Sequence, residues 1–248
     1  MSRRIFIAAA LAFAAVTAQS APAPDVLPAA SPEASTDRPV QFWFIRHGES
    51  EINVAAMAHP VPDAGVSYPL TRAGVQQALT LANALAATPI TTIYTSTRLR
   101  AIQTADAIAF RQGLNLTLAP EAIEMELGIP IDATDGRQLY RGLLQKWLIE
   151  KDINARIDAG ESFADAQKRF LPFVRELMNR HANDTGVVIV VSHGATLGLF
   201  VPVLAPNVPA DYMMSHPLSN TSIIKTELRD GKLFCTEWVG ERIPIAGN

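Results

Sequence analysis

Apolar runs and amphipathic stretches alternate from residue 40 to the end of the chain. Short runs of apolar and β-branched residues predict the strands, at 40–45 (VQFWFI), 91–95, 114–118, 187–191 (VVIVV) and a hairpin over 222–239. Longer stretches with apolar residues at helical spacing predict the helices, at about 73–87, 99–110, 138–150, 162–181 and 195–204. Thr71 is the expected N-cap of the first helix, and Asp230 and Gly231 the expected hairpin turn.

This order of elements predicts an α/β fold. Strands that alternate with helices form a mostly parallel central sheet with helices on both faces. After residue 40 no linker-like gap and no internal repeat interrupts the chain, so we expect a single three-layer domain over 40–248. In such sheets ligands bind beyond the carboxyl ends of the strands.

The start of the chain is typical of an export signal followed by a tether. Arg3 and Arg4 precede an apolar run at 5–16, which is shorter than the roughly 20 residues of a membrane span, and small residues follow it. We therefore expect a signal peptide at 1–20 and a protein exported to the periplasm or secreted, with no membrane span in the mature chain. Residues 21–39 hold five of the 17 prolines and predict a Pro/Ala-rich linker.

Composition narrows the possible classes. With 48% hydrophobic residues the chain is neither disordered nor collagen-like. A formal charge of −3 gives no indication of a nucleic-acid partner. Cys235 is the single cysteine, so an internal disulfide is excluded.

Three polar clusters follow predicted strands, at 46–50 (RHGES), 96–100 (STRLR) and 192–194 (SHG). They bring Arg46, His47, Arg100 and His193 to the same edge of the predicted sheet. Guanidinium groups match the oxygens of a phosphate, and glycine after each histidine lets the backbone approach a ligand. The clusters therefore predict a phosphate site.

A histidine in such a site can carry chemistry. The ordinary pKa of about 6.5 leaves histidine mostly neutral at pH 7, neighbouring positive charge favours the neutral form further, and a neutral imidazole can attack phosphorus. The leaving oxygen then needs a proton, for which Glu124 and Glu126 are both candidates. Arg98 is expected to pair with an acid, and Glu161 to be a carboxylate at a helix start rather than a catalyst.

The ordered motifs resemble the histidine phosphatase superfamily, which includes the phosphoglycerate mutases. The resemblance covers about 40–228 and rests on RHGES with Asn53, SxRxRA, the glutamate four residues before Gly128, GES at 160–162 and SHG. It implies a phosphoglycerate mutase-like fold, with no metal and no cofactor. It also implies that His47 is the nucleophile of a phosphohistidine intermediate, that Arg46, Arg100 and His193 hold the phosphoryl group with help from Asn53, and that Glu124 is the general acid.

Taken together, these patterns predict an exported, metal-independent phosphomonoesterase that acts on a small phosphorylated substrate. A mutase-type isomerase would use the same residues, and a catalytically silent module would bind phosphorylated ligands without turnover. The family often has Trp-Glu-Gly soon after the equivalent of Gly128, whereas this chain has Ile-Pro-Ile-Asp at 129–132. That departure leaves Glu126 as an alternative acid.

Overall fold

A seven-stranded sheet runs through the part of the chain that the computed structural model describes, residues 39–58, 68–129 and 133–245. The predicted signal peptide and all but the last residue of the predicted linker lie outside these ranges, so both stay predictions. No helix in the described ranges combines the length and the apolar composition that crossing a membrane requires.

The elements follow the chain in an order close to the one predicted. The strands are β1 (Gln41–Arg46), β2 (Ile90–Thr95), β3 (Leu116–Leu118), β4 (Val187–Ser192), β5 (Ile223–Arg229), β6 (Lys232–Trp238) and β7 (Glu241–Arg242). The helices are α1 (Glu51–Ala58), α2 (Arg72–Ala84), α3 (Leu99–Gln112), α4 (Gly136–Leu144), α5 (Phe163–Arg180) and α6 (Gly194–Leu204). Shorter turns are η1 (Pro120–Ala122), the π-helical η2 (Gln145–Ile149) and η3 (Tyr212–Met214).

The sheet has the order β3-β2-β4-β1-β5-β6-β7. β3, β2, β4 and β1 are parallel neighbours, and the C-terminal strands add an antiparallel edge next to β1. The predicted α/β fold with a mostly parallel central sheet is therefore confirmed. Because β1 and β4 lie side by side at the centre, their carboxyl ends open onto the same edge.

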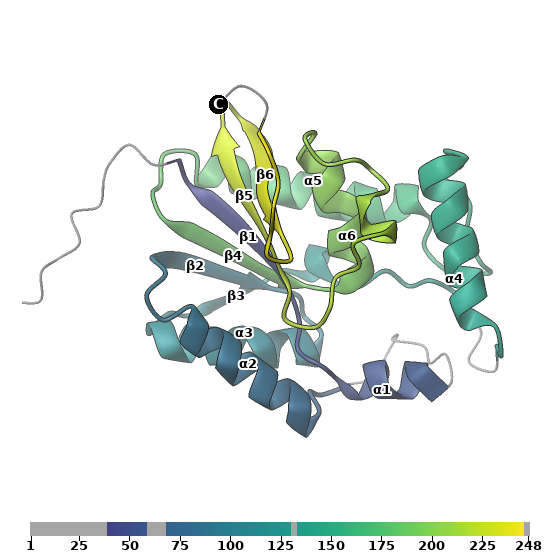
Figure 1. Ribbon diagram of the computed structural model, residues 1–248, viewed down its shortest axis with the longest axis horizontal. Coiled ribbons are helices and arrows are strands. Elements are labelled where there is room, and N and C mark those ends of the chain that lie inside the picture. The colour runs from purple at the N-terminus through teal and green to yellow at the C-terminus, as the bar shows by residue number, and fades with distance from the viewer. Residues whose placement is uncertain (1–38, 59–67, 130–132, 246–248) are drawn as a thin grey trace, which may run out of the picture. The chain divides into compact units, whose positions relative to one another are not determined.

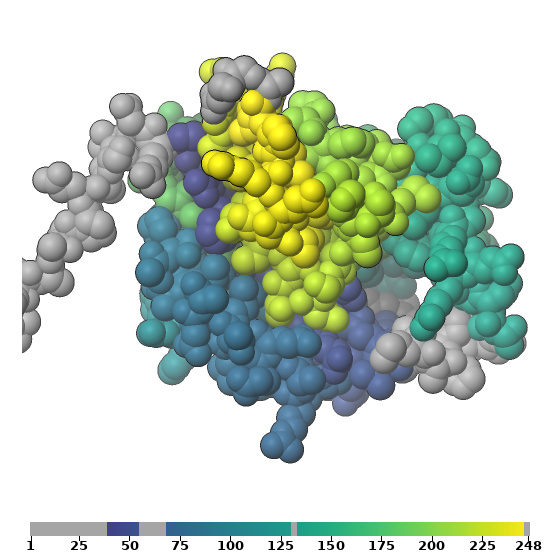
Figure 2. Space-filling model, in the orientation of Figure 1, coloured from purple at the N-terminus to yellow at the C-terminus, as the bar shows by residue number. Residues whose placement is uncertain are grey.

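Two hydrophobic clusters cover the two faces of the sheet. In β4 alternate residues divide between them: Val188 and Val190 belong to the cluster that includes α5 and α6, and Ile189 to the cluster that includes α2 and α3. Figure 1 shows the two helix pairs on opposite sides of the strands. In the space-filling view the side chains of α2 and of the β5–β6 hairpin leave only a strip of β1 visible (Figure 2).

The two predicted end signals, at Thr71 and at the 230–231 turn, are found in the structure, and the structure adds a cap at Ser162. Thr71 caps α2 by accepting a hydrogen bond from the Gly74 amide. Ser162 begins α5 with a reciprocal capping box. Asp230 and Gly231 both have positive φ in the β5–β6 turn, as a two-residue hairpin requires.

Three elements differ from the sequence expectation. The predicted strand 114–118 is shortened to β3 because the Leu114 amide bonds to Ala109 O and closes α3 through the left-handed Gly113. The predicted helix 138–150 is divided into α4 and the π-helical η2 that follows it directly. No helix was predicted at α1, because its sequence EINVAAMA is mostly apolar and has no amphipathic pattern.

Gly74 allows α2 to pack directly on the loop after β1. A Cβ at this position would lie 1.8 Å from the Glu49 carbonyl oxygen. Since that neighbour is backbone, we expect Gly74→Ala to lower the free energy of unfolding by about 3 kcal/mol, measured by urea denaturation. Gly142→Ala in α4, where a Cβ would meet nothing within 4 Å, is the control and should stabilise by about 0.5–1 kcal/mol. Equal stability of Gly74→Ala and wild type would contradict this packing.

Candidate active site

Three polar loops meet at one edge of the sheet because the strands before them are parallel. Arg46 at the end of β1 lies opposite Ser192 at the end of β4, and β2 pairs with the other side of β4. The residues that follow these strand ends are His47, His193 and Ser96. The predicted convergence of the clusters is therefore a direct consequence of strand register.

The imidazole of His47 has a hydrogen bond at each ring nitrogen and is 2% exposed. Nδ1 lies 2.6 Å from the Gly48 carbonyl oxygen, which can only accept, so this nitrogen is assigned the hydrogen. Arg100 donates from Nε to Nε2 at 3.1 Å, and a guanidinium can only donate. The two contacts select the neutral tautomer whose lone pair is on Nε2.

The surroundings of His47 oppose its protonation. Burial is the largest cause that lowers the pKa of His47 well below its usual value of 6.5, and the positive charges of Arg100 and Arg46 lower it further. The hydrogen bond to the Gly48 carbonyl acts in the opposite direction and is the smallest of the four causes. The imidazole is therefore held in the unprotonated form that a nucleophile needs.

His193 lies beside His47, with ring centroids 5.1 Å apart and ring planes inclined by 61°. Its Nε2 is 2.7 Å from Ser96 Oγ, and among the described residues that hydroxyl has no other acceptor, so its hydrogen is assigned to the bond with His193. This assignment puts the ring hydrogen on Nδ1, a buried atom with no hydrogen-bond partner among the described residues. Burial, followed by the His47, Arg100, Arg98 and Arg46 charges, lowers the pKa of His193 well below 6.5.

Arg46 supplies a second buried donor at the same edge. Its Nη1 donates to the Leu218 carbonyl, while its buried Nε has no partner within the described part of the chain. Gly194 permits this close approach to α6, since a Cβ there would lie 3.3 Å from Arg46 Nε. Burial lowers the pKa of Arg46, and the charge of Glu124 opposes that shift. Buried donors without partners at a cationic edge are suited to an oxyanion.

Glu124 lies at the N-terminus of α6. Its Oε2 accepts from the Ala195 amide at 3.2 Å, and its Oε1 accepts from the Thr196 amide at 3.0 Å and the Thr196 hydroxyl at 2.9 Å. Two amides at a helix start together form a site for a carboxylate. Because the Ala195 amide that binds it lies two residues after His193, the carboxylate of Glu124 lies next to the cationic edge.

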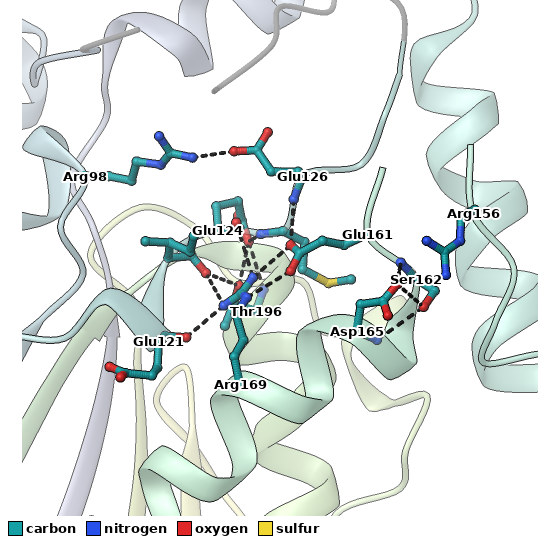
Figure 3. Close-up of polar contacts among 12 residues, drawn as sticks. Arg98, Glu121, Glu124, Glu126, Arg156, Glu161, Ser162, Asp165, Arg169 and Thr196 are labelled. Carbon is teal, nitrogen blue, oxygen red and sulfur yellow. Dashed lines mark hydrogen bonds and ion pairs between the residues drawn. The ribbon is translucent and has the colours of Figure 1, made fainter. Parts of the chain in front are cut away.

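Glu126, the alternative acid, has a different partner. Its carboxylate forms an ion pair with Arg98, which confirms the expected pairing of Arg98 with an acid. Figure 3 shows the two glutamate side chains on separate partners, Glu126 toward Arg98 and Glu124 toward Thr196. Of the two, Glu124 is the one that contacts the helix following His193.

Asn53, on α1, is linked to the backbone of the histidine loop through Asn220. The side-chain oxygen of Asn53 accepts from Ser50 Oγ at 3.0 Å and from Asn220 Nδ2 at 3.2 Å. Asn220 Nδ2 also donates to the His47 carbonyl at 3.0 Å. With its oxygen fixed in this way, Asn53 would contact an anion through Nδ2.

Sequence reasoning gave no role to several residues at this site. Thr104 accepts from the Gly48 amide at 3.0 Å and donates to the Arg100 carbonyl at 2.7 Å, so it connects the loop that carries His47 to α3. Its position one helical turn after Arg100 was a usable signal. Tyr140, on α4, gave no such signal, because nothing in the sequence places α4 near Glu124. Burial and the Glu124 charge raise the pKa of the Tyr140 hydroxyl.

Comparison with known proteins agrees with this arrangement. The sequence model of the histidine phosphatase superfamily (branch 1) matches residues 42–240. The chain belongs to the histidine phosphatase superfamily. Among curated proteins, no sequence matches this member significantly.

Solved structures with the same fold include several superfamily proteins. Bacillus stearothermophilus YhfR is 26% identical, with a TM-score of 0.66 over 82% of this chain and 97% of that one. A histidine-to-alanine mutant of phosphoserine phosphatase from Entamoeba histolytica, in complex with phosphoserine, is 24% identical, with a TM-score of 0.66 over 81% and 96%. A mycobacterial glucosyl-3-phosphoglycerate phosphatase is 20% identical, with a TM-score of 0.66 over 81% and 99%.

The site of this superfamily member has the parts that phosphoryl transfer needs. It combines an imidazole lone pair, cationic donors for the phosphoryl oxygens and a carboxyl group beside them. In the ranges the structure describes, no three His, Cys, Asp or Glu side chains form a set that could hold a metal ion. Arg46 and Arg100 supply positive charge at this edge.

The two buried histidines predict a pH-dependent stability. Because folding lowers the pKa of His47 and of His193, the unfolded chain binds protons at a higher pH than the folded protein does. Stability from each histidine is fully present above about pH 6.5 and falls below it, by up to about 1.4 kcal/mol per pH unit. Urea denaturation of His47→Gln and His193→Gln at a series of pH values should give a smaller slope than wild type.

The control for this measurement is His216→Gln, which changes an exposed histidine and should keep the wild-type slope. If both buried-site variants showed the wild-type dependence on pH, the inferred neutral state of the two imidazoles would be wrong.

Proposed function

We propose that this protein is an exported, metal-independent phosphomonoesterase that acts on a small phosphorylated substrate through a phosphohistidine on His47. The observation that most directly supports this proposal is the environment of His47 Nε2. This nitrogen has a lone pair, lies at a buried edge of the sheet and accepts a hydrogen bond from the Arg100 guanidinium at 3.1 Å. Two of the similar structures are a phosphoserine phosphatase and a glucosyl-3-phosphoglycerate phosphatase, which supports a phosphatase activity. Export rests on the sequence at 1–20.

In the first step, Nε2 of His47 gives up its hydrogen bond from Arg100 and attacks phosphorus, and the bond between phosphorus and the ester oxygen breaks. Arg46, Arg100 and His193 stabilise the charge on the equatorial oxygens, for which Arg46 Nε and His193 Nδ1 offer buried donors. Glu124 gives its proton to the leaving oxygen, which departs as an alcohol. The Gly48 carbonyl, which accepts from Nδ1, stabilises the positive imidazolium of the intermediate.

In the second step, water attacks the phosphohistidine. Glu124, now a carboxylate, takes a proton from that water, so the acid of the first step is the base of the second. The N–P bond breaks, inorganic phosphate leaves and His47 recovers its lone pair. A mutase would instead return the phosphoryl group to another oxygen of the substrate, and assaying free phosphate against isomerised product from 3-phosphoglycerate separates the two.

The covalent intermediate provides the direct test. Brief reaction with a ³²P-labelled phosphate ester, followed by denaturation, should yield acid-labile, alkali-stable label on wild type and none on His47→Gln, because that variant lacks the attacking nitrogen. His193→Gln is the matched control. It should still be labelled, but about 10²–10³-fold more slowly, since it loses one donor to the phosphoryl group. Label that survives in His47→Gln would refute the assignment.

The role of Glu124 predicts a dependence on the leaving group. Glu124→Gln should lower kcat/KM for an alkyl phosphate by about 10²–10⁴-fold, because an alkoxide needs the proton. It should lower kcat/KM for p-nitrophenyl phosphate by less than about tenfold, since that phenolate leaves without one. Glu126→Gln makes the same change two residues away and should affect both esters equally. Selective loss in Glu126→Gln would make Glu126 the acid.

A further inference from the structure

Arg169 connects α5 to the segment that carries the proposed acid. Its Nη1 donates to the Glu121 carbonyl at 2.7 Å and the Ile123 carbonyl at 3.0 Å, and its Nη2 donates to the carbonyl of Glu124 itself at 3.4 Å. Its Nε and Nη2 also donate to the two carboxylate oxygens of Glu161, both at 2.9 Å. These five contacts equal the number of N–H groups on a guanidinium.

Glu161 fixes the same segment from its other end. Its Oε2 accepts from the Glu126 amide at 3.0 Å, and its own amide donates to the Glu126 carbonyl. The expected place of Glu161, just before α5, is correct, but its carboxylate bonds to Arg169 and Glu126. Next to it, Gly128 and Gly160 bring the two backbones together, since a Cβ on Gly160 would lie 2.6 Å from the Gly128 nitrogen.

Glu124 is therefore held from two sides. Thr196 and the α6 amides hold its carboxylate, while Arg169 and Glu161 hold the backbone on which it sits (Figure 3). Side chains on a helix point back toward its N-terminus, which lets Arg169 reach Glu161 from two turns into α5. The contacts of Arg169 and Glu161 given above include none of the proposed phosphate ligands.

We propose that Arg169, through its pairing with Glu161, is a positioning residue for proton transfer by Glu124. The proposal rests on the proposed function. A general acid must lie within hydrogen-bond reach of the leaving oxygen, and a misplacement of about 1 Å costs on the order of 100-fold in rate. Three carbonyls on one planar group define the path of the backbone at 121–124 more closely than any single contact does.

The test compares Arg169→Lys and Arg169→Gln with wild type on two esters. Lysine keeps the positive charge but lacks the planar set of guanidinium N–H donors, so both variants should lose the positioning. We expect kcat/KM to fall by about 100-fold for an alkyl phosphate and by less than about fivefold for p-nitrophenyl phosphate. Glu161→Gln leaves the guanidinium in place and should show a smaller loss with the same selectivity. Equal slowing of the two esters would overturn the proposal, since a loss of folded protein slows both alike.

Arg180→Gln is the matched control, because it removes an arginine from the same helix that pairs with Glu176. It should leave the ratio of the two kcat/KM values unchanged, and a shift equal to that of the Arg169 variants would overturn the proposal.

Hydrogen–deuterium exchange gives a readout that does not depend on activity. Exchange of the peptide covering 121–128 should rise at least tenfold in Arg169→Lys, with exchange of β4 unchanged. Unchanged exchange at 121–128 would overturn the proposal. Failure of the proposed function is distinct, because wild type would then release no phosphate from either ester before any variant is compared.

Discussion

The chemistry of this protein depends on one constraint: an imidazole must keep an unprotonated nitrogen at a site built to attract anions. His47 satisfies this constraint through two hydrogen bonds: Nδ1 donates to the Gly48 carbonyl, and Nε2 accepts from Arg100. Burial and positive charge both lower its pKa, so the groups proposed to bind phosphate also keep the imidazole of His47 neutral. A cationic edge thus serves binding and reactivity at once.

Burying cationic groups at this edge lowers the free energy of unfolding, and the packing of the rest of the domain offsets that loss. Arg46 Nε and His193 Nδ1 are buried donors with no partner in the described ranges, and each costs about 1–3 kcal/mol that a bound oxyanion would relieve. The surrounding structure therefore has to be well packed, and β4 supplies it with residues buried on both faces of the sheet. Gly194 lets Arg46 lie close to α6 without a Cβ in the way. The favourable packing of the sheet thus offsets the unfavourable burial of these donors at its edge.

The sequence predicted the parts of this site that strand order controls. Patterning located β1 and β4, and parallel pairing then brought His47 and His193 together, so register alone determined that geometry. Sequence could not place the acid segment, because its path depends on contacts across 35 to 72 positions, from Glu161, Arg169 and Thr196. Such contacts leave no periodic signal. The export signal and linker lie in residues that the structure does not describe, and remain predictions.

Glu124 and Glu126 show how the fold gives two similar residues different roles. Both follow η1 within three residues of each other, and sequence chemistry alone treats them as equivalent. The ion pair with Arg98 turns Glu126 toward the loop after β2, whereas the amides of Ala195 and Thr196 hold Glu124 beside the phosphate site. A proton donor has to border the reacting group, and a carboxylate already paired with an arginine elsewhere is poorly placed to do so. In the proposed mechanism, Glu124 is therefore the acid because its side chain is the one that reaches the start of α6.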